Sequence, residues 1–365
     1  MKLFNLRAFT IGLGFAGLLA VTIYLGSGQL LHFDPALYWY AVGSLLAAFA
    51  VAYRFTIWAE RPPSRMYFKR GLQLIFRRGP ELLFKNSKSA IPGPVKVSLS
   101  RPILAAGLTL GSQYAAQDFI RKRSLYRWIM HLCLSGGCTL AFAVTFPLVF
   151  GWVHFQSAPD NPELYVMAAF GVTLDSFSIH SFQAFVTFNL LNISALIVMV
   201  GLVMAGYRRL TDAGERATQT FFEDILPLII ILAVTATGLM LTASYALMEG
   251  AGHGFIAVVH MLSVLLLLFY IPFGKLFHIF QRSSHLFVKI YRKAGDSGPR
   301  ASCKRCKVEF ASLMHVEDLK TVLDQLDFNY RYEAEGGHDH VHYQDICPPC
   351  RRKLLTVNQG IGIGR

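Results

Sequence analysis

Five histidines lie in or beside long apolar segments of this chain, where an ionisable side chain is costly and usually functional. His260 and His278 stand at the two ends of the segment HMLSVLLLLFYIPFGKLFH. His131 lies within RWIMHLCLSGG, His154 follows the same apolar run, and His180 precedes the next one. Neutral imidazole is a common ligand of haem iron. We therefore expect these side chains to hold haem inside a membrane.

A second set of candidate ligands lies near the C-terminal end, in the two motifs CKRC and CPPC. The four thiols are those of Cys303, Cys306, Cys347 and Cys350. Two CxxC pairs can supply four thiolates to one tetrahedral metal, most often zinc, and a rubredoxin-like iron site is the alternative. Lys307 and Arg351 follow the pairs, where rubredoxin loops favour glycine, so zinc is the preferred reading.

The apolar segments that carry the histidines are long enough to cross a bilayer. The chain is 53% hydrophobic and only 16% charged, whereas soluble domains average about 25% charged residues. Several apolar blocks exceed the roughly 20 residues that a spanning helix needs. The predicted fold class is an all-α membrane protein, a six-helix transmembrane bundle with a small cytoplasmic Cys-rich C-terminal domain. The expected spans are 8–31, 35–55, 126–153, 181–206, 224–248 and 254–279.

The placement of basic residues predicts how these spans are oriented. Lys and Arg are absent from 8–53, 128–207 and 217–274, and fourteen of them lie between Arg61 and Arg127. Positive residues are enriched in cytoplasmic loops. We therefore expect a multi-pass protein of the cell inner membrane with both termini in the cytoplasm. The net charge of +13 then reflects topology and not nucleic-acid binding, and the cytoplasmic thiols are expected to be reduced.

The spans divide the chain into four expected regions. Residues 1–55 form two N-terminal transmembrane helices, and 126–282 form a four-helix haem b core. Between them, 56–125 is a basic cytoplasmic or interfacial connection, in which MYFKRGLQLIFRRGPELLFK has the spacing of a helix on an anionic lipid surface. This connection is either a topogenic loop or a docking surface for a cytoplasmic partner. Residues 283–365 form the metal-binding tail.

Helix geometry suggests how the histidines pair. His260 and His278 are 18 residues apart, which is five whole turns and about 27 Å of one ideal helix, so both imidazoles face the same way near opposite membrane surfaces. This arrangement suits two stacked haems, His131 pairing with His278 and His154 with His260. His131 and His154 are about 140° out of phase on an ideal helix unless Pro147 kinks it. His180 is therefore an alternative outer ligand.

At this point the sequence resembles a known group of proteins. The segment that ends in PFGKLFH looks like the last core helix of the respiratory nitrate reductase gamma subunit family. RWIMHLCLSGG resembles the first core helix of related membrane cytochrome b subunits, those of heterodisulfide reductase and of DsrM-type complexes. The resemblance covers about residues 120–282. It implies that His131, His260 and His278 are haem ligands, whereas Ala141 stands where the nitrate reductase pattern has a further histidine.

The resemblance and the histidines together predict a membrane cytochrome b subunit of a respiratory oxidoreductase. Such a subunit would transfer electrons between the quinone pool and an iron–sulfur electron-transfer subunit, with a catalytic subunit beyond it, on the cytoplasmic side. Two b-type haems would carry the electrons, with no catalytic residue in this chain. The alternative is a transporter or membrane anchor with a regulatory zinc-binding tail. A transporter would be expected to place carboxylates or interrupted helices at mid-membrane.

Overall fold

The computed structural model describes residues 4–75, 111–328, 331–333 and 340–363, and it is mostly helical, at 73%. The chain divides into two compact units, each of which combines segments that are distant in sequence. We call residues 1–57 and 111–280 the membrane unit, and residues 58–110 and 281–365 the tail unit.

Six helices in the described part of the chain are long and apolar enough to cross a membrane, which indicates a multi-pass membrane protein. The candidate spans are Leu6–Gly26, Pro35–Glu60, Leu125–Val149, Phe182–Thr211, Phe221–Leu247 and His253–Phe273. The long helices that form them are α1 (Leu6–Gly26), α2 (Tyr38–Glu60), α7 (Leu125–Val149), α8 (Phe182–Thr211), α10 (Leu226–Leu247) and α11 (His253–Phe273). The six expected spans are thus confirmed in number and approximate position.

Shorter helical segments connect these spans. They are η1 (Pro35–Leu37), η2 (Gly111–Ala116), α6 (Asp118–Arg121), α9 (Ala213–Thr218), η3 (Phe221–Ile225), η4 (Lys275–Phe277) and α12 (His278–Gln281). Polar caps begin three of the spans, because the first N–H groups of a helix have no intrahelical partner. The side chains of Asn5, Ser124 and Ser181 accept hydrogen bonds from the backbone N–H groups of the first turns of α1, α7 and α8.

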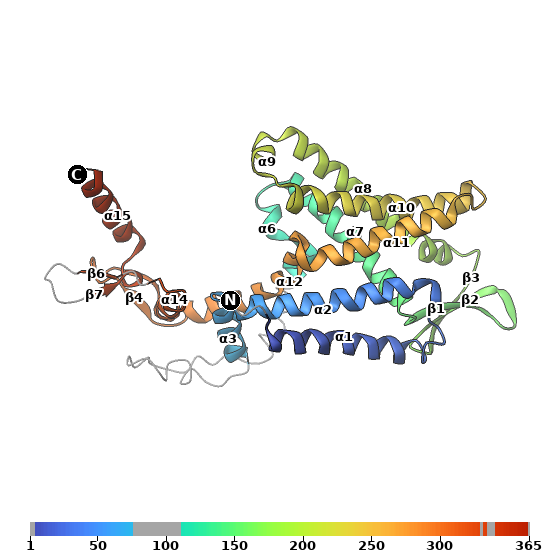
Figure 1. Ribbon diagram of the computed structural model, residues 1–365, viewed down its shortest axis with the longest axis horizontal. Helices are drawn as coiled ribbons and strands as arrows, with labels where there is room; N and C mark the ends of the chain where they lie inside the picture. Colours follow the sequence, from blue (N-terminus) through green and yellow to red (C-terminus); the bar gives the residue numbers. More distant parts are fainter. Residues whose placement is uncertain (1–3, 76–110, 329–330, 334–339, 364–365) are drawn as a thin grey trace. The chain divides into compact units, whose positions relative to one another are not determined.

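Helices α7, α8, α10 and α11 pack around one apolar core, and each can be followed in Figure 1. Val198, Ile230 and Leu267 are buried where α8, α10 and α11 meet. Helices α7 and α8 approach each other closely. A Cβ atom added to Gly137 would lie 2.5 Å from the Val198 side chain and 3.0 Å from a backbone oxygen of α8. Small residues commonly permit such close packing between transmembrane helices.

Helices α1 and α2 run side by side in Figure 1 and join this bundle through α11. A Cβ atom on Gly12 would lie 3.0 Å from the side chain of Phe49, which fixes the approach of α1 to α2. On the other side of α2, a Cβ on Gly43 would lie 2.6 Å from Leu265 of α11. The guanidinium of Arg54 donates to the backbone oxygen of Pro272. The N-terminal pair is therefore part of the bundle.

A three-stranded antiparallel sheet joins α7 to α8, which an all-α fold did not anticipate. Its strands, in the order β1-β2-β3, are β1 (Val153–Ala158), β2 (Asn161–Ala169) and β3 (Val172–Ser178). Phe170 and Gly171 form the β2–β3 turn with φ values of 52° and 78°, and two positive φ angles are what a type I′ hairpin requires. The Trp152 indole donates to the backbone oxygen of Thr22 at 2.9 Å, which ties the sheet to α1.

The tail unit combines short helices with two small hairpins. Its elements are α3 (Ser64–Ile75), η5 (Arg282–Ser284), α13 (His285–Asp296), β4 (Arg300–Ser302), β5 (Glu309–Ser312), α14 (Leu313–Gln325), β6 (Arg331–Glu333), β7 (His340–His342), η6 (Tyr343–Asp345) and α15 (Pro348–Ile363). Strand β4 pairs with β5, and β6 pairs with β7, both antiparallel.

Helix α3, the first helix of the expected basic connection, packs on α13 of the tail. The Phe68 ring lies 4.8 Å from that of Phe287. Arg70 donates to both carboxylate oxygens of Asp318 on α14, at 2.6 to 3.1 Å, and the Tyr291 hydroxyl donates to the same carboxylate at 2.9 Å. The apolar face of α3 is thus packed against α13 of the same chain. The remainder of the connection from 76 to 110 lies outside the described residues.

Candidate metal centre and membrane histidines

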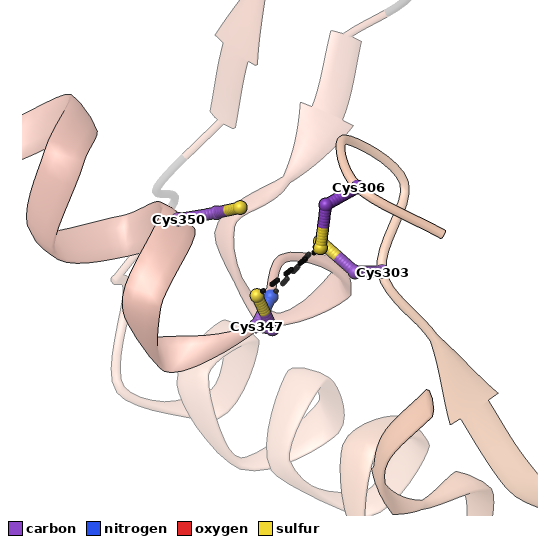
Figure 2. A group of neighbouring side chains, drawn as sticks. All are labelled: Cys303, Cys306, Cys347 and Cys350. Carbon is purple, nitrogen blue, oxygen red and sulfur yellow. Dashed lines mark hydrogen bonds between the residues drawn. The ribbon is translucent and has the colours of Figure 1, made fainter. Parts of the chain in front are cut away.

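The four cysteines of the tail converge on one point (Figure 2). Their sulfur atoms all lie within 4.8 Å of one another, and those of Cys306 and Cys347 are 3.6 Å apart. Sulfurs that surround zinc tetrahedrally at about 2.3 Å are about 3.8 Å from each other. A disulfide needs about 2.05 Å, and the thiols are free. The group could therefore bind a metal such as zinc or iron, as the two CxxC motifs predicted.

The first pair stands in the loop between β4 and β5. The backbone N–H of Lys307 donates to the Cys303 oxygen at 2.9 Å, and that of Cys303 donates to the Val308 oxygen at 2.9 Å. Lys307 has φ 62°, in the left-handed region that favours glycine. This position thus adopts the conformation that glycine would give it. The absence of glycine after CKRC therefore does not separate zinc from iron.

The second pair lies at the start of α15, as Figure 2 shows. Cys347 directly precedes the helix and Cys350 lies in its first turn. The guanidinium of Arg351 donates to the backbone oxygens of Ile346 at 2.6 Å and Gln344 at 3.2 Å. These bonds hold the chain that enters the helix, and so they fix the direction in which both sulfurs point.

The surroundings of Cys303 favour its thiolate form. Burial alone would raise the pKa of the Cys303 thiol, but backbone N–H groups of Cys306, Cys347 and Arg305 point at the sulfur and lower the pKa to about 6. The Cys347 N–H lies 3.3 Å from it. Three of the four cysteines are buried, and Cys306 is exposed. A metal held here would be reached from solvent on the Cys306 side.

In the membrane unit, His131 is held from a neighbouring segment. Its Nδ1 lies 2.7 Å from Oε1 of Gln117, and the amide nitrogen of Gln117 donates to the Ser135 hydroxyl at 2.6 Å. Gln117 is only 2% exposed and has φ 51°. A left-handed backbone is costly for a residue other than glycine. The contacts of the Gln117 side chain must therefore hold it in this conformation. This contact fixes the plane of the His131 ring.

His260 is held in a comparable way by α10. Its Nδ1 lies 2.9 Å from the hydroxyl of Thr237. Gly238 stands beside the ring, where an added Cβ atom would be 3.4 Å from the His260 Cε1. Helix α10 therefore presents a hydrogen-bonding group and a small residue to this imidazole, so that the ring can lie close to the helix.

His278 does not continue the helix that carries His260. Helix α11 ends at Phe273, and Gly274, with φ −92° and ψ −167°, breaks it before η4 and α12. The alignment of the two imidazoles over five turns of one straight helix is therefore wrong. Nδ1 of His278 lies 2.7 Å from the backbone oxygen of Lys275, so the break itself positions the ring. The ammonium of Lys275 pairs with Asp224 at 2.5 Å.

His154 lies in β1 and not on a spanning helix, because α7 ends at Val149. The phase difference calculated from His131 on one helix therefore does not apply. The His154 ring stacks on that of His32, with centroids 3.7 Å apart and planes 10° apart. Its Nδ1 is buried and has no hydrogen-bond partner among the described residues. Burial lowers the pKa of His154, and His32 lowers it further.

His180 lies in the turn before α8 with its side chain exposed. Stacking uses the face of the His154 ring and leaves its edge, where both nitrogens lie. His154 stays the preferred outer ligand, because stacking on His32 holds its ring in place, whereas His180 is exposed. The two partners Gln117 and Thr237 were not anticipated, since only their distance in space from the histidines distinguishes them from other polar residues.

Comparison of the chain with models of protein families, with curated proteins and with solved structures gives no match. The resemblance to the nitrate reductase gamma subunit family therefore stays a prediction that rests on its short motifs.

Proposed function

We propose that this protein is a membrane cytochrome b subunit that transfers electrons between the quinone pool and an iron–sulfur partner on the cytoplasmic side. One observation carries the proposal. His131, His260 and His278 each have Nδ1 in a hydrogen bond with an oxygen atom of a fixed neighbour, at 2.7 to 2.9 Å. Metal-binding histidines usually have such a bond, because it sets the tautomer and the ring orientation. Three such bonds at apolar spans favour ligation over an incidental polar role.

The donor set fits haem. His131 and His278 would hold one haem, and His260 would hold another together with His154, which lacks, among the described residues, the Nδ1 hydrogen bond of the other three. Haem held by these residues would supply one-electron transfer. Gln117, Thr237 and the backbone of Lys275 would orient the rings. A quinol oxidised here would give up two electrons and release two protons to water, and the apolar bundle would keep water away from the histidines.

The tail unit would be a metal-binding domain of this subunit. We propose that the four cysteines hold zinc, with iron as the alternative, and that the metal stabilises the fold of the tail unit. The loop between β4 and β5 is joined to the segment before α15 by the hydrogen bond from the Lys304 N–H to the Asp345 oxygen, at 2.9 Å, and by apolar contacts around the sulfurs. The sulfurs and the buried Ile346 form a small cluster of their own. A metal that links the two segments therefore adds much to the stability of a domain this small.

The test is a reduced-minus-oxidised optical spectrum of the purified full-length protein, with pyridine haemochrome and metal analysis of the same sample. We expect a b-type α-band, two haems per chain and one zinc or iron. Leucine in place of His131 or His260 should each remove about half of the haem. His180→Leu is the matched control and should remove none. A protein without an α-band would refute the electron-transfer proposal and favour the transporter or anchor.

A further inference from the structure

A group of uncharged polar side chains lies between α8 and α10. The Thr242 hydroxyl donates to Oδ1 of Asn192 at 2.9 Å. Nδ2 of Asn192 donates to Oδ1 of Asn189 at 3.1 Å, and Nδ2 of Asn189 donates to the backbone oxygen of Phe185 at 2.9 Å. We call Asn189, Asn192 and Thr242 the amide group. Polar side chains within spanning helices are costly, and they occur chiefly where they bind something or join helices.

The hydrogen bonds within α8 account for only half of the amide donors in this group. Each amide nitrogen carries two N–H groups, and the described contacts use one on Asn189 and one on Asn192. Both amide oxygens already accept a bond. One N–H per amide is thus left to donate, and where lipid surrounds a spanning helix an unsatisfied donor is costly. These N–H groups would be satisfied by a carbonyl or ether oxygen of a molecule that is itself dissolved in the lipid.

The amide group also lies at the outer surface of the bundle, where lipid would reach it. Thr242 is exposed, and the flanking rings of Phe185 and Tyr245 are 61% and 81% exposed. Tyr245 also lines an open hollow of about 640 Å³ at the α10–α11 turn, together with Glu249 and His253. Phe185 and Tyr245 stand one helical turn from Asn189 and Thr242 on the same helix faces, and planar rings there suit a flat ligand that carries ring carbonyls.

The amide group lies at the depth of His260. Counted from the helix ends on the side of the β1–β3 sheet, Asn189 is about 10 Å inside α8, and Thr242 is about 8 Å inside α10. His260 is about 10 Å inside α11 from the same end. Helix α10 contacts both, since Thr237 bonds His260 and Thr242 bonds Asn192.

We propose that the amide group is the quinone-binding site of this protein, with the spare N–H groups of Asn189 and Asn192 donating to one ring oxygen and the rings of Phe185 and Tyr245 flanking the quinone ring. The proposal rests on the proposed function, because it assigns that function's substrate to a site near His260. The same donors would also suit an ester carbonyl of a phospholipid, and the experiment separates these two sources.

The experiment is photolabelling of the full-length protein in lipid nanodiscs with an azido-quinone, followed by mass spectrometry of the labelled peptides. We expect label on the 182–193 and 242–249 segments, with competition by decylubiquinone. Asn192→Leu should weaken competition about tenfold, the effect of one lost hydrogen bond near the upper end of the usual range. Asn192→Gln, which keeps the donors, should restore at least part of it, and its haem content checks the fold.

The outcomes are distinct. Label elsewhere on the chain, or label at these segments that Asn192→Leu leaves unchanged in a folded protein, would overturn the site. A phospholipid that co-purifies at α8 and is not displaced by decylubiquinone would also overturn it. A protein that binds quinone here but shows no haem band would refute the proposed function and leave the site intact. A haem band without quinone labelling would refute the site and leave the proposed function intact.

Discussion

The ion pair between Arg70 and Asp318 offers a quantitative test of the tail unit. The two residues are 248 positions apart, and Asp318 accepts two bonds from Nε of Arg70, one from its terminal nitrogen and one from the Tyr291 hydroxyl. The side chain of Asp318 is 8% exposed and that of Arg70 is 20% exposed. The pair is therefore largely removed from water. It connects α3, from before the third span, to α14 in the C-terminal segment.

Replacing Asp318 with Ala removes one acceptor from the mostly buried guanidinium of Arg70 and from the buried hydroxyl of Tyr291. Breaking one partner of a buried pair costs about 3 to 5 kcal/mol, and the partial exposure of Arg70 places this case near 3 kcal/mol. Since about 1.4 kcal/mol is a factor of ten, the open form of the tail unit should become about a hundredfold more populated. The double variant Arg70→Met with Asp318→Leu should recover part of the loss, because the apolar pair needs no partner, while the Tyr291 hydroxyl still lacks its acceptor.

Native-state proteolysis of the full-length protein in detergent measures this change, because cleavage follows the population of the open form when closing is fast. Arg65→Ala, an exposed residue on the same helix, is the control and should change the free energy of opening by less than about 0.5 kcal/mol. We assign this pair as the contact that holds α3 to the C-terminal segment of the tail unit. An effect of Asp318→Ala below about 1 kcal/mol, or a double variant as unstable as the single one, would refute this assignment.

Three further predictions concern packing, pH and metal. Gly137→Ala should destabilise the bundle by about 1 to 3 kcal/mol in unfolding assays, because its Cβ would lie 2.5 Å from Val198; Gly136→Ala, whose Cβ meets nothing within 4 Å, should be neutral, and equal effects would contradict the packing. Burial lowers the pKa of His315, so its neutral form contributes stability that is present above about pH 6.5 and is lost as the pH falls through the lowered pKa. His315→Gln should flatten hydrogen exchange of α14 between pH 7.5 and 5.5, and an unchanged slope would count against this. Cys347→Ser should abolish bound zinc or iron and expose the tail to protease, with haem content unchanged, and retained metal would show that the cysteines are not its ligands.

Local composition and spacing explain why much of this architecture was predictable. A spanning helix needs about 20 apolar residues wherever it lies in the bundle, so runs such as 226–247 can be recognised without knowledge of their neighbours. The CxxC motifs are equally local, because each places two thiols on one turn. The sheet at 153–178 was missed although it has turn signals at Pro159–Asp160 and Phe170–Gly171. A short strand gains its stability from the strand beside it, and the apolar content around it suggested only a loop between spans.

By itself, the sequence determined the six spans, the four-thiol group and the histidines that stand at apolar segments, because hydrophobic length and ligand type are properties of single segments. Only the tertiary structure decided which group orients each imidazole, as Gln117 does for His131 and Thr237 for His260. It also decided that Gly274 separates His278 from α11, and that α3 belongs to the tail through Asp318. These facts depend on contacts between residues far apart in the chain, whose free energy arises from burial and geometry that no local pattern records.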